Sequence, residues 1–320
     1  MIARRTLLCA AAALPFAACR RTPPLRIGYQ NNGLLLAAKA RGAVEAALRP
    51  VPVAWALFPS GPPLLEALSV GGALSGVDVG GTGDTPPIFA QAAGARIVYI
   101  AAQPVSGTAA AIVVPRRSRL RTAADLRGAK LAFTRGSSAQ AFVRAALATV
   151  GLGLDDVSAV NLTPVQARLA FAAGAIDAWA IWDPFLAAAE VELGARVLVA
   201  GAGLARSTSF VLANADAARA HPDLIMATLD ALVETGRWAA AHRNDLAALI
   251  AGSGVPAAVA SRIAARQELG LVPLTPAIVA AQQHIADTLF ADHQLPGPVA
   301  VAPAMWHGWT PHPGERDKSR

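Results

Sequence analysis

Short apolar runs alternate with Ala-rich segments along most of the chain. The runs at residues 25–29, 51–58 and 97–101 have the length and the content of β-branched and aromatic residues that buried strands have. Segments that we interpret as helices lie between these runs, and Gly and Pro mark many of the boundaries. Strands and helices that alternate in this way are typical of a mainly parallel sheet with helices on its faces. The pattern therefore predicts an α/β fold.

One predicted strand-to-helix junction, at residues 77–90, has the features of an anion-binding turn. Gly83 and the two glycines before it permit positive φ angles and a close approach of the backbone to a neighbour. Asp84 and Thr85 are residue types that begin helices, and the prolines that follow fit a first helical turn. A helix that begins here directs unpaired N–H groups and a partial positive charge into the space ahead of it. Such a helix end can bind an anion without an arginine side chain.

A second junction, at residues 176–185, repeats this layout further along the chain. Asp78 precedes Asp84 by the same interval that separates Asp177 from Asp183. The second Asp of each pair stands at the start of a predicted helix that contains Pro. The matched pair predicts two similar lobes. The alternative interpretation is that both units are ordinary strand-to-helix turns of an α/β protein.

Two further junctions carry polar side chains where a predicted strand ends. The first strand runs into Gln30 and an Asn-Asn-Gly turn, at the edge where open α/β sheets bind ligands. Ser137 and Ser138 follow the predicted strand 130–133 and precede a helix, so their hydroxyls and the first N–H groups suit a sulfonate, a phosphate or a carboxylate. A plain Asn-Gly turn and plain helix capping are the alternative interpretations.

The second junction also contains two tryptophans at positions of opposite parity along the predicted strand. Residues of opposite parity on one strand face opposite sides of the sheet. Trp182 is the last residue before the helix, so we expect it to face a cleft. Trp179 is then expected to lie in the core.

The order of the elements predicts two lobes that are joined by two crossovers. Residues 103–109 contain Pro and Gly and are expected to be irregular, so they mark the first crossing. A β-rich segment at 207–213 marks the return. The polar C-terminal segment, with Pro and Gly, reads as a loose tail. We therefore assign 23–106 and 207–305 to lobe 1, 107–206 to lobe 2, and 306–320 to a flexible tail.

Residues 1–19 have the organisation of an export signal. An arginine pair precedes an apolar stretch, and small residues then lead to Cys19. This end resembles the lipobox of bacterial lipoproteins, in which the Cys is lipidated, although Phe16 stands where Leu is usual. The arginine pair also resembles a twin-arginine signal, but ordinary secretory signals often contain two arginines. We expect a periplasmic or extracytoplasmic protein, and the sequence leaves open a lipid anchor at Cys19 or free release.

Composition and charge narrow the classes of function. The chain of 320 residues is 54% hydrophobic, but much of this is Ala, and no later apolar run free of charge and Pro is long enough to span a bilayer. Both cysteines, Cys9 and Cys19, lie in the leader, so the mature chain has no disulfide and no Cys metal site. The formal net charge is +7, without the aromatic-interleaved basic stripe that nucleic-acid binding favours. His307 and His312 have no partners at metal-ligand spacing.

Five motifs stand in the predicted strand and helix segments described above. They are Leu-Arg-Ile-Gly-Tyr-Gln at 25–30, Phe-Pro-x-Gly-Pro at 58–62, Thr-Gly-Asp-Thr-Pro-Pro-Ile-Phe-Ala-Gln-Ala-Ala-Gly-Ala at 82–95, Arg-Gly-Ser at 135–137 and Asp-Ala-Trp-Ala-Ile-Trp-Asp-Pro-Phe-Leu-Ala-Ala-Ala-Glu at 177–190. Together they resemble the substrate-binding proteins of aliphatic sulfonate ABC transporters. The resemblance extends from residue 25 to about residue 222 and, within the sulfonate, nitrate and taurine group, favours alkanesulfonates. It implies a two-lobed periplasmic-binding-protein fold of type II, a monomer that closes on its ligand, and a membrane permease and an ATPase as partners.

The resemblance also implies which residues line the cleft. By position, the N–H groups and hydroxyls near Thr85 and Ser138 hold the sulfonate oxygens, and Trp182 packs on the apolar tail. A sulfonate stays ionised at any relevant pH, so neutral donors suffice. The two aspartates either cap their own helices or receive a cationic group of the substrate. The implied ligand-binding set is Gln30, Gly83, Asp84, Thr85, Ser137, Ser138, Trp182 and Asp183, with Gln30 as an amide donor.

Two other functions stay open at this point. The same fold could bind taurine, nitrate or a pyrimidine precursor, or it could be an enzyme such as a pyrimidine-precursor synthase or a small-acid lyase. An enzyme is disfavoured because no Cys, His or Lys stands at the four junctions, and helix capping explains Asp84 and Asp183 without a carboxylate pair. We therefore expect a binding protein with no catalytic residues, no metal and no cofactor.

Overall fold

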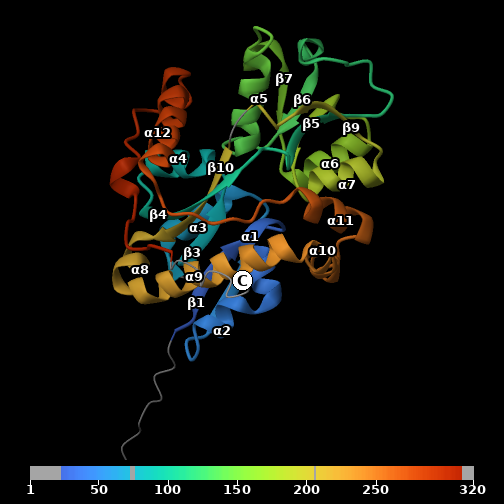
Figure 1. The fold of residues 1–320 in the computed structure, drawn as a ribbon. Helices are drawn as coiled ribbons and strands as arrows, with labels where there is room; N and C mark the ends of the chain where they lie inside the picture. Colours follow the sequence, from blue (N-terminus) through green and yellow to red (C-terminus); the bar gives the residue numbers. More distant parts are fainter. Residues whose placement is uncertain (1–22, 73–75, 205–206, 312–320) are drawn as a thin grey trace, which may run out of the picture.

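The protein consists of two α/β lobes, each built on one five-stranded sheet (Figure 1). The computed structural model describes residues 23–72, 76–204 and 207–311. The predicted leader and Cys19 lie outside the described residues. We call the part around the first sheet lobe 1 and the part around the second sheet lobe 2.

The first sheet has the strand order β2-β1-β3-β10-β4. Strand β1 is parallel to β2 and β3, whereas β10 is antiparallel to both of its neighbours, β3 and β4. The other four strands therefore point the same way, and only β10 is reversed. The strands are β1 (Leu25–Tyr29), β2 (Val53–Leu57), β3 (Val79–Thr82), β4 (Ile97–Val105) and β10 (Ser207–Asn214).

The second sheet repeats this arrangement with the order β7-β6-β8-β5-β9. Its reversed strand is β5, which is antiparallel to β8 and β9 while β6 is parallel to β7 and β8. The expected α/β class with two mainly parallel sheets is confirmed. The strands are β5 (Ala110–Val114), β6 (Lys130–Phe133), β7 (Ser158–Asn161), β8 (Ala178–Trp182) and β9 (Arg196–Ala200).

Helices cover both faces of each sheet, and a buried apolar cluster lies on each face. In lobe 1 one face carries α1, α9, α10 and α11, and the other carries α3, α4 and α12. In lobe 2, α5 covers one face and α6 and α7 cover the other.

The helices of lobe 1 before the crossover are α1 (Gly33–Arg41), α2 (Ala43–Ala47), α3 (Gly61–Val70) and α4 (Thr85–Ala92). Those of lobe 2 are α5 (Ser138–Ala148), α6 (Pro164–Ala172) and α7 (Phe185–Glu192). The C-terminal helices are α8 (Ala215–Ala220), α9 (Pro222–Ala241), α10 (Arg243–Gly252), α11 (Ala257–Arg266) and α12 (Pro276–Ala291). None of the helices in the described ranges is both long and apolar enough to cross a bilayer.

The first aspartate of each matched pair has the same structural role in its lobe. The Asp78 carboxylate accepts hydrogen bonds from the N–H groups of Arg26 (2.9 Å) and Gly72 (3.0 Å). The Asp177 carboxylate accepts one from the N–H of Lys130 at 2.8 Å. Each carboxylate therefore binds the backbone at the start of the neighbouring parallel strand. This shared contact explains why the first aspartate of each pair, Asp78 or Asp177, recurs in the sequence.

Two segments are more ordered than the sequence suggested. Strand β4 continues through Pro104 to Val105, because β10 pairs with it along its whole length, so residues 103–105 are not irregular. The expected flexible tail is wrong for residues 306–311. Trp309 is only 5% exposed and its indole N–H donates to Asp230 at 2.9 Å, since a buried indole gains both apolar area and a hydrogen bond. Residues 312–320 of that tail lie outside the described residues.

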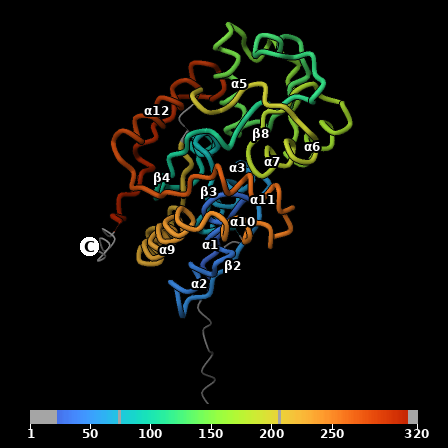
Figure 2. The backbone as a smooth tube through the Cα atoms, turned by 45° about the vertical axis from the view of Figure 1, so that its right-hand side comes forward, coloured from blue at the N-terminus to red at the C-terminus, as the bar shows by residue number. Residues whose placement is uncertain are grey.

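Helix α11 joins the two lobes by lying against α7, as Figures 1 and 2 both show. The guanidinium of Arg266 donates from Nε to Asp183 Oδ2 (2.7 Å), and from Nη2 to Asp183 Oδ1 (3.0 Å) and Glu190 Oε2 (2.7 Å). The side chain of Asp183 is 1% exposed and that of Arg266 is 17% exposed. Asp183 also accepts the N–H of Ala187 (3.0 Å) in the first turn of α7. We call Asp183, Glu190 and Arg266 the ion cluster.

Burial and charge pairing shift the two central groups of the ion cluster by different balances. Burial raises the pKa of Asp183 to about 6, even though Arg266 and the Ala187 N–H favour the carboxylate form. Burial also disfavours the charge on Arg266, but Asp183 and Glu190 outweigh this effect and hold the pKa of the guanidinium above its ordinary value. Proton uptake by Asp183 therefore falls close to neutral pH, whereas Arg266 stays charged.

We expect the stability of the protein to reflect this raised pKa. Between about pH 4 and about pH 6 the folded chain binds a proton at Asp183 that the unfolded chain does not, so its contribution to stability increases as the pH falls. Acidification from about pH 7.5 to about pH 5 should stabilise wild type relative to Asp183→Asn by about 1 kcal/mol. Urea unfolding of both proteins at several pH values measures this difference.

Asp155→Asn is the matched control, because it removes an exposed carboxylate from the same lobe. A wild type that loses stability relative to Asp183→Asn on acidification would show that the ion pair with Arg266 dominates over burial.

Candidate functional site

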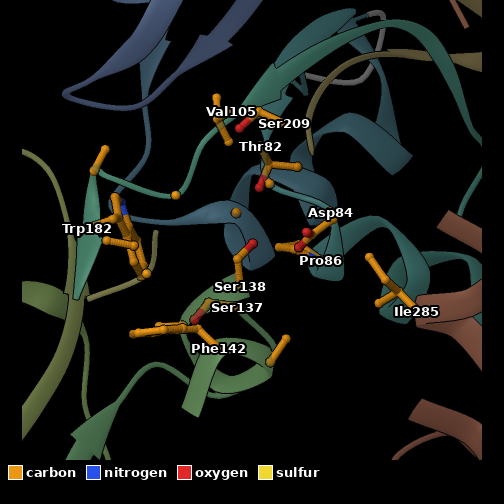
Figure 3. A pocket seen from close by; sticks show the side chains of 18 of the residues that line it. Thr82, Asp84, Pro86, Val105, Ser137, Ser138, Phe142, Trp182, Ser209 and Ile285 are labelled. Carbon is orange, nitrogen blue, oxygen red and sulfur yellow. The ribbon is translucent and has the colours of Figure 1, made fainter. Parts of the chain in front are cut away.

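A cavity of about 780 Å³ lies between the two lobes (Figure 3). Its walls are formed by the junctions where β1, β3, β6 and β8 end and helices begin. Because these strands are parallel within each sheet, their carboxyl ends meet at the same edge and face the same space. Seven of the eight predicted site residues line the cavity: Gln30, Gly83, Asp84, Ser137, Ser138, Trp182 and Asp183.

Thr85 is the predicted residue that the structure places outside the cavity lining. Its side chain is completely buried, and its hydroxyl donates to Asp84 Oδ1 at 2.9 Å. A contact between this hydroxyl and a ligand was therefore the wrong expectation. Thr85 is the first residue of α4, and Pro86 and Pro87 follow it without N–H groups. Two of the first positions of α4 therefore contribute no N–H donor.

Helix α5 offers a fuller set of donors. It begins at Ser138 and runs for 11 residues. The Gln140 N–H donates to the Ser137 carbonyl at 3.0 Å, which leaves the N–H groups of Ser138 and Ala139 without partners inside the helix. Ser138 and Ala139 line the cavity at this end. Among the described residues, none makes a hydrogen bond to the Ser138 hydroxyl, which Figure 3 shows beside Asp84 and Pro86. The hydroxyl and the N–H groups can therefore all bind an anion.

Ser137 stabilises the turn before α5 instead of capping the helix with its side chain. Its hydroxyl donates to the carbonyl of Thr134 at 2.6 Å. The N–H of Gly136 donates to Gln140 Oε1 at 2.7 Å. These two bonds fix the backbone just before Ser138, so Ser137 shapes the helix start rather than offering its hydroxyl.

Gly83 brings the two lobes into contact at the cavity. A Cβ atom at this position would lie only 2.1 Å from the Ser138 hydroxyl and 3.2 Å from Ser138 Cβ. Gly83 follows β3 of lobe 1 and Ser138 begins α5 of lobe 2. Only a residue without a side chain allows this approach, which confines the space around the α5 donors.

The two tryptophans of β8 face opposite sides of the sheet, as the alternation of side chains along a strand predicts. Trp179 is fully buried in the core with α6 and α7, whereas Trp182 is half-buried and lines the cavity. Gln30 donates one N–H from Nε2 to the carbonyl of Gly81 at 3.1 Å. One amide N–H of Gln30 therefore remains for a ligand.

Two cavity residues, Asn32 and Arg266, were not predicted from the sequence. Asn32 donates to the carbonyl of Asp183 at 2.8 Å and so links the lobes. It stands in the Asn-Asn-Gly turn, so its polar character was visible but its partner was not. Arg266 lines the cavity next to Asp183, and nothing in its Ala-rich helix marks it.

Helix α12 contacts the backbone of Asp84. Asp84 is only 6% exposed, and its carbonyl oxygen accepts a hydrogen bond from Gln282 Nε2 at 2.7 Å. Gln282 Nε2 also donates to the hydroxyl of Tyr99 at 3.1 Å. Burial raises the pKa of Tyr99 above its ordinary value, so this phenol stays protonated. The start of α4 is therefore fixed by neutral hydrogen bonds.

The arrangement suits binding of an anion that carries an apolar part. The described residues include no group of His, Cys, Asp and Glu that could hold a metal ion. His284 lines the cavity from α12, but no hydrogen bond in the described chain joins its ring to a serine of the cavity. The chemistry at hand is donation of hydrogen bonds from α5 and apolar contact with residues such as Trp182 and Phe142.

Comparisons with known proteins agree with this geometry. The family model described as NMT1/THI5 like matches residues 72–245. A relative from Escherichia coli (strain K12), named for binding aliphatic sulfonates, is 38% identical over 296 residues, which are 91% of this chain and 92% of that protein.

Two solved structures are similar over nearly the whole chain. The alkanesulfonate-binding protein SsuA from Xanthomonas axonopodis pv. citri bound to MOPS has a TM-score of 0.85 and 40% identity, covering 90% of this chain and 99% of that chain. The periplasmic aliphatic sulphonate binding protein SsuA from Escherichia coli has a TM-score of 0.79 and 38% identity, covering 88% and 97%. A desulfurization enzyme, DSZB, has a TM-score of 0.61 and 19% identity, and this likeness shows the fold alone. The chain therefore belongs to the NMT1/THI5-like family, and within that family it is a relative of the aliphatic sulfonate-binding proteins.

Proposed function

We propose that this protein is an exported solute-binding protein that captures an aliphatic sulfonate between its lobes and delivers it to an ABC importer. The observation that carries the proposal is the start of α5, where the N–H groups of Ser138 and Ala139 and the Ser138 hydroxyl lie at the inter-lobe cavity. The two similar solved structures are named as an alkanesulfonate-binding protein and an aliphatic sulphonate binding protein, and these names support the same ligand class.

The donors at the cavity fit the charge of a sulfonate. N–H groups and hydroxyls satisfy its oxygens, and the dipole of α5 favours its negative charge. Arg266 is already engaged by Asp183 and Glu190, so the guanidinium is not needed as a direct partner. Gln30 contributes its second amide N–H, and Trp182 packs on the carbon atoms next to the sulfonate. Gly83, Asp84, Thr85, Ser137 and Asp183 shape this site through the contacts described above.

Export and the transport partners follow from the same proposal. The export signal at 1–19 and the relative that is named periplasmic both support a periplasmic location, with Cys19 as the position of a lipid anchor if one is attached. The partners are a membrane permease and an ATPase, and the protein acts as a monomer. We further propose that the two lobes move as two bodies when the ligand binds. Lobe 1 consists of residues 23–106 and 207–305, and lobe 2 consists of residues 107–206.

A sulfonate is favoured over the other ligands that this fold could take. A cavity of about 780 Å³ lies in the range of drug-sized ligands and is far larger than nitrate requires. A pyrimidine precursor needs paired donors and acceptors for its ring, whereas beyond the serines at its start α5 lines the cavity mainly with Ala and Phe. An enzymatic role lacks a nucleophile with a neighbouring base among the described cavity residues.

Tryptophan fluorescence and calorimetry test the ligand class. We expect a saturable fluorescence change with an alkanesulfonate and a weaker response or none with nitrate. Trp182→Ala should weaken binding about 10-fold by calorimetry, about 1.4 kcal/mol, because the ligand loses an aromatic contact. Trp238→Phe is the control, since Trp238 stacks on Arg41 and His242 outside the cavity. A protein that binds nitrate or a pyrimidine and no sulfonate would keep the fold and refute this ligand class.

Gly83→Ala tests the contact between the lobes at the site. Its Cβ would displace the Ser138 hydroxyl or separate the lobes, and either response removes a donor from the anion. We expect at least about a 10-fold loss of sulfonate affinity with little change in the melting temperature. Gly252→Ala is the matched control, because a Cβ there meets no atom within 4 Å. Unchanged sulfonate affinity in Gly83→Ala would show that the anion does not bind at Ser138.

A further inference from the structure

The cavity changes in polarity from one end to the other. Near Trp182 its walls are polar, because Asn32, Asp183 and Arg266 are joined there by hydrogen bonds and the ion cluster. In Figure 3, Trp182 and Ile285 lie on opposite sides of Ser138 and Asp84. The side toward Ile285 is bounded by helices α5 and α12, which present Ala, Ile and Leu side chains together with a few polar ones.

We call this second part the α5–α12 arm. Its lobe 2 wall is one face of α5, where small side chains recur at helical spacing and leave open space. Its lobe 1 wall is α12, with a half-buried Ile and a buried Leu one turn apart. The apolar residues that line the arm are Ala141, Ala145 and Ala148 of α5 and Ile285 and Leu289 of α12. The same two helices also present Arg144, His284, Thr288 and, directly after α12, Asp292 to the cavity.

The two walls of the arm are joined to each other at its outer end. Arg144 of α5 forms an ion pair with Asp292, directly after α12. Gln140 Nε2 donates to Gln294 Oε1 at 3.0 Å. These bonds connect α5 and α12 across the outer end of the arm, so the arm is a part of the inter-lobe cavity in the arrangement seen here.

We propose that the α5–α12 arm binds the tail of the ligand, so that the protein prefers sulfonates with a long or ring-bearing apolar tail over short ones. The sulfonate then lies between Trp182 and Ser138, and the tail passes Phe142 into the arm. An amphiphilic anion placed this way puts its charge at the polar end and its carbon chain against Ala, Ile and Leu side chains. This inference rests on the proposed function and adds the position and size of the tail.

Calorimetric titration with methanesulfonate and octanesulfonate tests the inference. Wild type should bind octanesulfonate more tightly, by up to about 4-fold for each methylene that becomes buried. Ala145→Trp fills the arm, so we expect at least about a 30-fold loss for octanesulfonate and less than about a 2-fold change for methanesulfonate. Ala172→Trp is the matched control, since Ala172 is exposed on α6 of the same lobe and does not line the cavity.

A second variant keeps the test valid if Ala145→Trp does not fold. Ile285→Ser makes the opposite wall polar without adding bulk, and it should weaken octanesulfonate about 10-fold while leaving methanesulfonate unchanged.

Two results would contradict the proposal that the α5–α12 arm binds the tail of the ligand. Equal losses for both ligands would show that the variants only prevent closure, and unchanged octanesulfonate affinity would place the tail on the Trp182 side. If the wild-type protein binds neither sulfonate, both the proposed function and this inference are wrong. The wild-type titration alone shows this result, so it can be told apart from a failure of the arm proposal.

Discussion

The site depends on a constraint of the backbone. A helix leaves its first N–H groups without partners, and in a parallel sheet a strand delivers the following helix to the carboxyl edge of that sheet. Both lobes obey this rule, so four helix starts face the gap between them. Of these, α5 keeps its N–H groups, whereas the prolines of α4 remove two donors. The two helix starts are therefore unequal, and the stronger anion site belongs to lobe 2.

The ion cluster explains how two buried carboxylates are tolerated beside an anion site. A buried charge is costly unless it is paired and hydrogen-bonded. Arg266 makes bonds to both Asp183 and Glu190, and the Ala187 N–H adds another to Asp183. Arg262 adds a second guanidinium, with its Nε 3.6 Å from Glu190 Oε2, so the two arginines together offset the two carboxylates and little repulsion remains at the α5 helix start. The cluster also fastens α11 to α7, so the same side chains that border the cavity connect the two lobes.

Sequence alone could predict the parts of the site that depend on neighbours in the chain. Gly83, Asp84 and Ser138 stand directly after strands, and their residue types reveal the turns and helix starts around them. What it could not predict depends on contacts between distant segments. The burial of Thr85 follows from the rotation of α4 against its lobe, and the role of Arg266 follows from a partner 83 residues away. The packing of Trp309 was missed for the same reason, because its polar and Gly-rich surroundings indicate a loop and its partner Asp230 lies on α9.

The repeated aspartates show how two similar lobes can acquire different roles. Asp78 and Asp177 make equivalent bonds to the start of a neighbouring strand, because each sheet needs that contact within its own lobe. Asp84 and Asp183 begin from equivalent positions but meet different surroundings. The C-terminal helices follow β10 in the chain, and two of them contact these aspartates: α12 reaches the backbone of Asp84 and α11 reaches the carboxylate of Asp183. The asymmetry of the cavity, polar near α11 and apolar near α12, therefore arises from one C-terminal segment that covers two repeated frameworks in different ways.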